Sequence, residues 1–173
     1  MRTNLNQLFE TAYRDESDAI FRFCLVRVSD RDQALEIMQE TFLRFWQSLS
    51  LQQEILNKRA FLFTIARYLI IDWYRKKKSF SLDRMNENKK EMYDLIDEKT
   101  TEDIPFNAEG RYLIERIDEL AASYRDPVYL RFVECLSPVE IGDVLGISAN
   151  TASVRINRGL LKLRKRAGYD YIY

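Results

Sequence analysis

The stretch that decides the fold is SPVEIGDVLGISANTASVRINRGLLKLRKR, residues 137–166. Ser137, the proline after it and Glu140 match a helix start. Serine caps a helix, proline suits the first helical position, and a glutamate three residues on can close a capping box. Gly146 suits a left-handed helix stop, and Ser148 can cap a second helix. The stretch therefore predicts two short helices joined by a tight turn.

The second of these helices is predicted to have one apolar side and one polar, basic side. Its apolar residues recur at helical spacing, namely Ile147, Ala152, Ile156, Leu160 and Leu163. A short helix, a glycine turn and a second helix with basic residues outward are typical of a helix-turn-helix that binds DNA. The alternative is a helical hairpin in an ordinary bundle.

Helical spacing of apolar residues extends through most of the chain. It predicts helices over residues 1–28, 31–49 and about 58–78, and again from about 108 and from Pro127. Residues 79–108 are polar, acidic and poor in periodic apolar residues, so they are predicted to form a linker. We therefore expect an all-α fold of two small helical domains, residues 1–78 and 109–173, joined by a flexible acidic linker.

The composition excludes several kinds of enzyme. The chain has no histidine, which removes histidine-based nucleophilic catalysis and the common zinc motifs. Its first glycine is Gly110, so no glycine-rich phosphate loop precedes that position. Cys24 and Cys135 do not suggest a disulfide framework, and no apolar run approaches the ~20 residues of a membrane span. We expect a cytoplasmic protein without catalytic residues, cofactor, metal or membrane insertion.

The charge is unevenly distributed although the formal net charge is zero. Residues 1–78 carry 13 Lys and Arg against 10 Asp and Glu, and residues 79–109 carry 4 against 9. Residues 110–173 carry 10 against 8. Two mildly basic blocks therefore flank an acidic one. This charge asymmetry bears on which kinds of partner each block can bind.

The predicted helix over residues 58–78 combines aromatic and basic residues. Four aromatic residues lie outside its apolar stripe and precede a basic run at 75–78; they are Phe63, Tyr68, Trp73 and Tyr74. Rings that stack on bases and cations that hold phosphates are typical of single-stranded DNA binding. The alternative, on composition alone, is a core helix with a solubilising basic end.

Segments in both halves of the chain resemble one protein family. One match is to region 2 of sigma-70 factors, which is similar to DQA at 32–34 together with QETFLRFW at 39–46. The next helix of that region is similar to RAFLFTIAR at 59–67 together with IDWYRK at 71–76. Residues 136–166 resemble region 4. A linker between them, without further domains, resembles the extracytoplasmic-function (ECF) group of sigma factors.

The resemblance implies roles for the N-terminal half. In the family the second helix docks on the β′ clamp helices of RNA polymerase, and the matching residues here are Glu36, Gln39, Glu40 and Arg44. The loop at 50–57 and the third helix would read the promoter −10 element, with one base flipped into a pocket. The matching residues are Lys58, Arg59, Phe63, Arg67, Tyr68, Trp73, Arg75 and Lys76. Tyr68 stands where the family often has asparagine.

The resemblance also implies that the second helix of the helix-turn-helix reads the −35 element. The matching residues are Thr151, Ser153, Val154, Arg155, Asn157, Arg158 and Lys162. Arginine can contact guanine and asparagine can contact adenine in the major groove. Ala152, Ser153 and Val154 depart from the valine, lysine and serine that are usual in the family.

Together these matches imply a sigma factor that directs promoter-specific initiation and aids DNA melting. The implied partners are core RNA polymerase, through the β′ clamp helices and β flap, promoter DNA and an anti-sigma factor, in a bacterial cytoplasm. No small-molecule substrate is implied. The alternatives are a helix-turn-helix regulator with an N-terminal sensor or dimerisation domain, and a helical scaffold without a DNA role.

Overall fold

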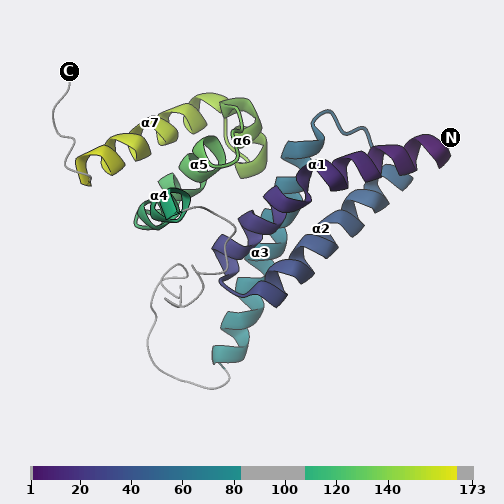
Figure 1. Ribbon diagram of the computed structural model, residues 1–173, viewed down its shortest axis with the longest axis horizontal. Coiled ribbons are helices and arrows are strands. Elements are labelled where there is room, and N and C mark those ends of the chain that lie inside the picture. Colours follow the sequence, from purple (N-terminus) through teal and green to yellow (C-terminus); the bar gives the residue numbers. More distant parts are fainter. Residues whose placement is uncertain (1, 83–107, 167–173) are drawn as a thin grey trace. The chain divides into compact units, whose positions relative to one another are not determined.

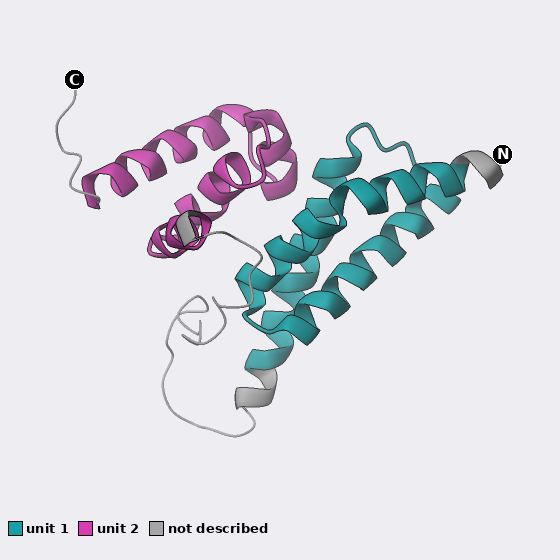
Figure 2. Ribbon diagram, in the orientation of Figure 1, with its two compact units in different colours: residues 1–104 teal, residues 105–173 magenta. Residues whose placement is uncertain are grey.

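The structure is a computed structural model that describes residues 2–82 and 108–166 (Figure 1). The described residues form seven helices and no strand, so the all-α prediction is confirmed. The chain divides into two compact units, Met1–Ile104 and Pro105–Tyr173 (Figure 2). Most of the predicted linker, residues 83–107, lies outside the described residues. The assignment of residues 1–78 and 109–173 as two functional domains remains a prediction.

Unit 1 consists of three helices that pack side by side, each in contact with the other two (Figure 1). They are α1 (Arg2–Val28), α2 (Arg31–Ser50) and α3 (Lys58–Leu82). The α1 helix is continuous over the predicted range, including the polar residues 15–18. The α3 helix runs four residues beyond its predicted end, so the basic residues 75–78 do not terminate it.

Local capping residues begin the second and third helices of unit 1. The Asp30 carboxylate accepts a hydrogen bond of 3.0 Å from the Gln33 N–H at the start of α2. The Asn57 side chain accepts one of 2.9 Å from the Ala60 N–H at the start of α3. Each cap satisfies an N–H that has no partner within its own helix.

Aromatic rings fill much of the core of unit 1. The Phe9 ring of α1 lies 5.4–6.3 Å, between centroids, from three rings of α2: Phe42, Phe45 and Trp46. Phe45 also lies 6.3 Å from the Phe61 ring of α3. Aromatic side chains bury large areas, so these contacts contribute to the stability of the three-helix unit.

Unit 2 consists of α4 (Ala108–Asp118), α5 (Ala122–Phe132), α6 (Pro138–Leu145) and α7 (Ala149–Arg166). The α6–α7 pair has the predicted helix-turn-helix caps. The Ser137 N–H donates to the Glu140 carboxylate at 2.7 Å, and the Glu140 N–H donates to Ser137 Oγ at 3.3 Å. Gly146 has φ +67°, and Ser148 Oγ accepts from the Thr151 N–H at 3.1 Å.

The prediction that a helix begins at Pro127 was wrong. The α5 helix begins at Ala122, so Pro127 lies inside it. Proline removes one helical hydrogen bond, but its ring is buried beside Val128, and burial favours the longer helix. In α4 the buried residues are Ile114 and Ile117, and Tyr112 and Leu113 are exposed.

Two glycines allow close packing around α7. A Cβ atom on Gly142 would lie 2.7 Å from the backbone oxygen of Ile147 in the turn that follows α6. A Cβ atom on Gly159 would lie 2.5 Å from Cγ2 of Val128 on α5. The first contact is with backbone, which cannot rotate away. The turn that aims α7 therefore requires glycine at position 142.

We expect Gly142→Ala to destabilise unit 2 by roughly 1–2 kcal/mol. The clash outweighs the gain of about 1 kcal/mol in helix propensity that alanine brings. Hydrogen exchange of the α6 and α7 amides measures the local free energy of unfolding. Asp143→Ala, at the exposed neighbouring position, is the control and should change that free energy by less than about 0.5 kcal/mol. A Gly142→Ala protein as protected as the parent would contradict the close approach.

Candidate nucleic-acid interface

One side of α7 is buried and the opposite side is exposed. Ala152, Ile156 and Gly159 are buried within unit 2. On the other side lie Val154, Asn157, Arg158 and Lys162, all exposed. In the described part of the chain Asn157 and Arg158 have no hydrogen-bond or ion-pair partner. Their polar groups are available to an external ligand such as base edges in a DNA groove.

The remaining predicted residues of α7 are less exposed. Thr151, Ser153 and Arg155 are half-buried, and the Thr151 hydroxyl lies 2.8 Å from Ser148 Oγ at the helix start. The Lys162 ammonium lies 5.5 Å from the centroid of the Tyr124 ring. Sequence reasoning missed Leu161, which is 62% exposed. Leu161 lies three residues after Arg158, and this helical spacing could have indicated that both residues lie on the same side of α7.

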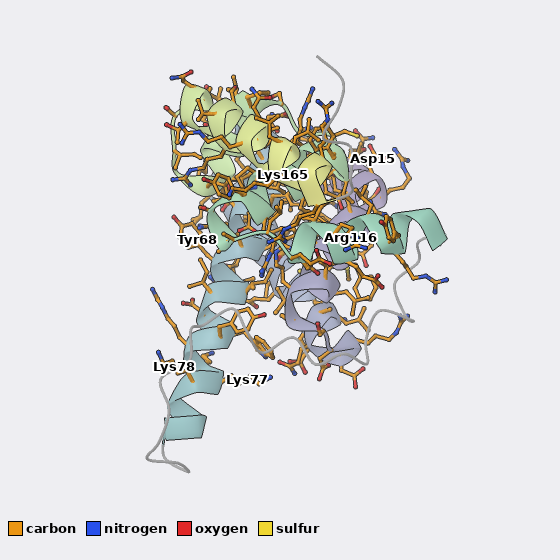
Figure 3. The ribbon with its side chains drawn as sticks, turned by 90° about the vertical axis from the view of Figure 1, so that its left-hand side faces the viewer. Asp15, Tyr68, Lys77, Lys78, Arg116 and Lys165 are labelled. Atoms are coloured by element: carbon orange, nitrogen blue, oxygen red, sulfur yellow. The ribbon has the colours of Figure 1, made fainter. Side chains whose placement is uncertain are left out.

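The basic end of α7 is fastened to the end of α4. The Arg166 guanidinium donates to the Glu119 backbone oxygen at 2.7 Å and lies 3.6 Å from the Glu119 carboxylate. Arg164 and Lys165 are exposed, and Lys165 is labelled in Figure 3. Arg166 therefore helps to hold the last turn of α7 within unit 2, whereas its two neighbours face solvent.

The α3 helix has an exposed side with aromatic and basic residues. Lys58 and Tyr68 are exposed, the latter by 57%, and Arg67 is half-buried. The basic cluster, which we define as residues 75–78, is exposed and includes Arg75 and Lys76. Figure 3 shows Lys77 and Lys78 extending from α3, with Tyr68 further along the same helix. This side can contact a phosphate backbone.

Phe63 was predicted to lie on this exposed side of α3, and this is wrong. Its side chain is completely buried, and its ring packs edge-on against Phe23 of α1 with 5.3 Å between centroids. The reason is that α3 contacts both α1 and α2, so more than one side of the helix is covered. Phe63 is a core residue in this fold, so its ring is not available at the surface of α3.

Arg59 is also partly withdrawn from the surface. Its guanidinium lies 3.2 Å from the Glu16 carboxylate of α1 and 5.8 Å from the centroid of the Phe63 ring. The pair joins residues 43 positions apart, which helical spacing could not reveal. In the loop before α3, Leu51 and Leu56 are 82% and 92% exposed, and the sequence prediction named the loop but not these side chains.

The predicted docking residues of α2 lie on its exposed side. Glu36, Gln39 and Arg44 are exposed and Glu40 is half-buried. The Arg44 guanidinium donates to the Glu40 carboxylate at 2.7 Å. Leu43, which is 51% exposed, lies between them and was missed. A single exposed leucine is ordinary on a protein surface, so Leu43 does not by itself identify a binding surface.

The described residues offer little for acid-base or metal chemistry. Burial raises the pKa of the Cys24 thiol to about 12, so it stays protonated near neutral pH. No group of three or more Cys, Asp or Glu side chains in the described ranges is arranged to hold a metal ion. Within the same ranges, none of the helices is long and apolar enough to cross a membrane.

Comparison with known proteins identifies the family. Residues 12–80 match the family described as Sigma-70 region 2, and residues 110–163 match Sigma-70, region 4. The ECF RNA polymerase sigma factor SigW of Bacillus subtilis is 31% identical over 157 residues, which cover 86% of this chain and 83% of SigW. SigX of the same organism is 25% identical, over 95% of this chain and 84% of SigX.

Solved structures share the fold. The sigma factor RpoE of Bartonella quintana, crystallised with the anti-sigma factor NepR, has a TM-score of 0.69 at 18% identity and covers 94% of this chain and 98% of its own. CnrH, solved with the cytosolic domain of CnrY, has a TM-score of 0.61 at 20% identity and covers 99% and 92%.

This chain belongs to the ECF group of sigma-70 family RNA polymerase sigma factors. It is a factor for promoter-specific transcription initiation, and its family acts without catalysing a reaction itself.

We expect Phe63→Ala to lower the free energy of unfolding of unit 1 by about 3–5 kcal/mol, because it leaves a cavity in the core. Tyr68→Ala, five residues along the same helix, is the matched control and should change it by less than about 0.5 kcal/mol. Urea unfolding followed by circular dichroism measures both. Equal stability of the two variants would contradict the burial of Phe63.

Proposed function

We propose that the two units read one promoter at two places while α2 holds the polymerase. In this proposal the domain of residues 1–78 binds core polymerase and the −10 element, and the domain of residues 109–173 binds the −35 element. The observation that carries it is that α2 and α7 each bury one side and leave most of the residues matched to a sigma-factor surface outward. The α3 helix, although covered on more than one side, exposes Lys58, Tyr68 and the basic cluster.

The −35 element is assigned to the exposed side of α7. Asn157 and Arg158 have the donors and acceptors that read adenine and guanine in the major groove, and Val154 can contact a thymine methyl group. Lys162, Arg164 and Lys165 add phosphate contacts, which position the helix without specifying sequence. Arg155, Thr151 and Ser153 border this surface and contribute at its edge.

The −10 element is assigned to the loop at 51–57 and the exposed side of α3. Leu51 and Leu56 give the loop apolar side chains that can line a pocket for a flipped base. Tyr68 offers a ring for stacking, and Lys58 and the basic cluster hold phosphates of the parted strands. Trp73 lies next to the basic cluster, and Arg59 supports the start of α3 through Glu16.

Core polymerase is assigned to the exposed side of α2. Glu36, Gln39, Glu40 and Arg44 offer charged and polar groups around Leu43, which adds an apolar contact. Such a surface fits a partner with basic and apolar residues, as we propose for the β′ clamp helices. A second contact, between unit 2 and the β flap, follows from the family alone.

We further propose a cytoplasmic location and control by an anti-sigma factor. Both follow from membership of a family whose members work with polymerase. One solved structure with this fold, that of RpoE, was obtained with an anti-sigma factor, NepR. An anti-sigma factor would act by covering one or more of the three surfaces described above.

Reconstitution with core RNA polymerase tests the proposed function. Promoter-specific run-off transcripts are expected, and a helix-turn-helix regulator or a scaffold would give none. If the Arg158 guanidinium contacts a base, Arg158→Ala should weaken binding to the −35 element by about 1–3 kcal/mol. Transcription from a cognate promoter should then fall by roughly 5- to 150-fold. The control Arg164→Ala should weaken all promoters alike. An unchanged promoter profile for Arg158→Ala would reject a base-reading role.

Charge reversal on α2 tests the docking surface. Glu36→Lys with Glu40→Lys should weaken core-polymerase binding by at least about tenfold, because like charges would then face each other. Binding is measured by titration of fluorescently labelled sigma factor with core enzyme. Glu10→Lys with Asp18→Lys, exposed on α1, has the same net charge and is the control. Undiminished binding of the α2 variant would count against this surface.

A further inference from the structure

Three side chains of α2 and α3 form a continuous hydrogen-bonded chain in unit 1. The Trp73 indole N–H donates to Oε1 of Gln33 at 2.7 Å, across 40 positions of sequence. Nε2 of Gln33 donates to the Glu36 carboxylate at 3.1 Å. Gln33 therefore joins a proposed DNA-binding residue to a proposed polymerase-docking residue, although sequence reasoning assigned it no role.

The two partners specify one orientation of the Gln33 amide. The indole N–H is a donor only, so it requires the amide oxygen. An ionised carboxylate is an acceptor only, so Glu36 requires the amide nitrogen. If the amide were reversed, its NH₂ group would face the indole N–H and its oxygen would face the Glu36 carboxylate, so neither hydrogen bond could form. Gln33 is thus held in one position, and it holds the indole in turn.

The Trp73 ring is fixed on other sides as well. The Lys77 ammonium lies 4.9 Å from its centroid, and the Tyr74 ring lies edge-on at 4.9 Å. The Tyr74 hydroxyl donates to the Arg27 backbone oxygen near the end of α1. Indole and ammonium together form a preset aromatic and cationic surface at the start of the basic cluster, which we call the Trp73–Lys77 surface.

We propose that Gln33 is a positioning residue that presets the Trp73–Lys77 surface for unpaired DNA at the start of melting. The inference rests on the proposed function of α3. Stacking on a base and pairing with a phosphate require a ring and a cation in fixed relative positions, and presetting them avoids an entropic cost when the strand binds. Through Glu36, the same contact chain extends to the docking surface.

The experiment compares Gln33→Met with the parent in the reconstituted holoenzyme. Methionine keeps the length of the side chain but offers neither a strong acceptor for the indole N–H nor a donor for Glu36. We expect Gln33→Met to reduce promoter opening, measured by permanganate reactivity at saturating sigma factor, by roughly 3- to 10-fold, which is the effect of one hydrogen bond.

A double-mutant cycle separates positioning from general destabilisation. In the Trp73→Phe background, Gln33→Met should have less than about a twofold further effect, because the indole N–H is already gone. In the Trp46→Phe background, Gln33→Met should increase acrylamide quenching of Trp73 fluorescence in the free protein. The control Gln7→Met, on an exposed residue of α1, should change neither measurement.

The outcomes distinguish this inference from the proposed function. If the parent holoenzyme does not open promoters, the proposed function fails. If the parent opens them and Gln33→Met opens them equally well, the positioning role fails. It also fails if Gln33→Met has its full effect in the Trp73→Phe background.

Discussion

The burial of one side of α7 within unit 2 is the interaction on which the proposed DNA-binding surface depends. Gly159 allows α7 to approach Val128 of α5 closely, and Ala152 and Ile156 are buried on the same side. Because the helix is rigid, this burial fixes the direction in which Asn157 and Arg158 point. In the same way, burial of one side of α2 in unit 1 orients the side that we propose for polymerase docking. Hydrophobic packing thus decides which polar groups can reach a partner.

The α3 helix has three structural roles, which a helix with one buried and one exposed side could not combine. It contributes Phe63 and Ala66 to the core, exposes Tyr68, and joins α2 through Trp73. Contact with two neighbouring helices leaves only a narrow outward strip. This strip explains why a helix rich in aromatic residues presents few of them to solvent. It also places the exposed cations on the same helix as the residues that hold the unit together.

Features that depend on neighbouring residues were predictable from the sequence. The Ser137–Glu140 capping box, the left-handed Gly146 and the Ser148 cap all follow from local backbone chemistry. Features that depend on distant residues were not. The Arg59–Glu16 pair, the Gln33–Trp73 hydrogen bond and the burial of Phe63 arise from how helices meet. The Pro127 error has a related cause, since tertiary burial outweighed a local helix-breaking signal.

The contact between Arg166 and Glu119 has a consequence for the last turn of α7. The helix is joined to α6 by the turn at its start, and its last residue contacts the residue that follows α4. Helix ends fray, and an exposed ion pair alone restrains them little. The hydrogen bond from the Arg166 guanidinium to the Glu119 backbone oxygen adds a tertiary contact at the residue where fraying of α7 would begin.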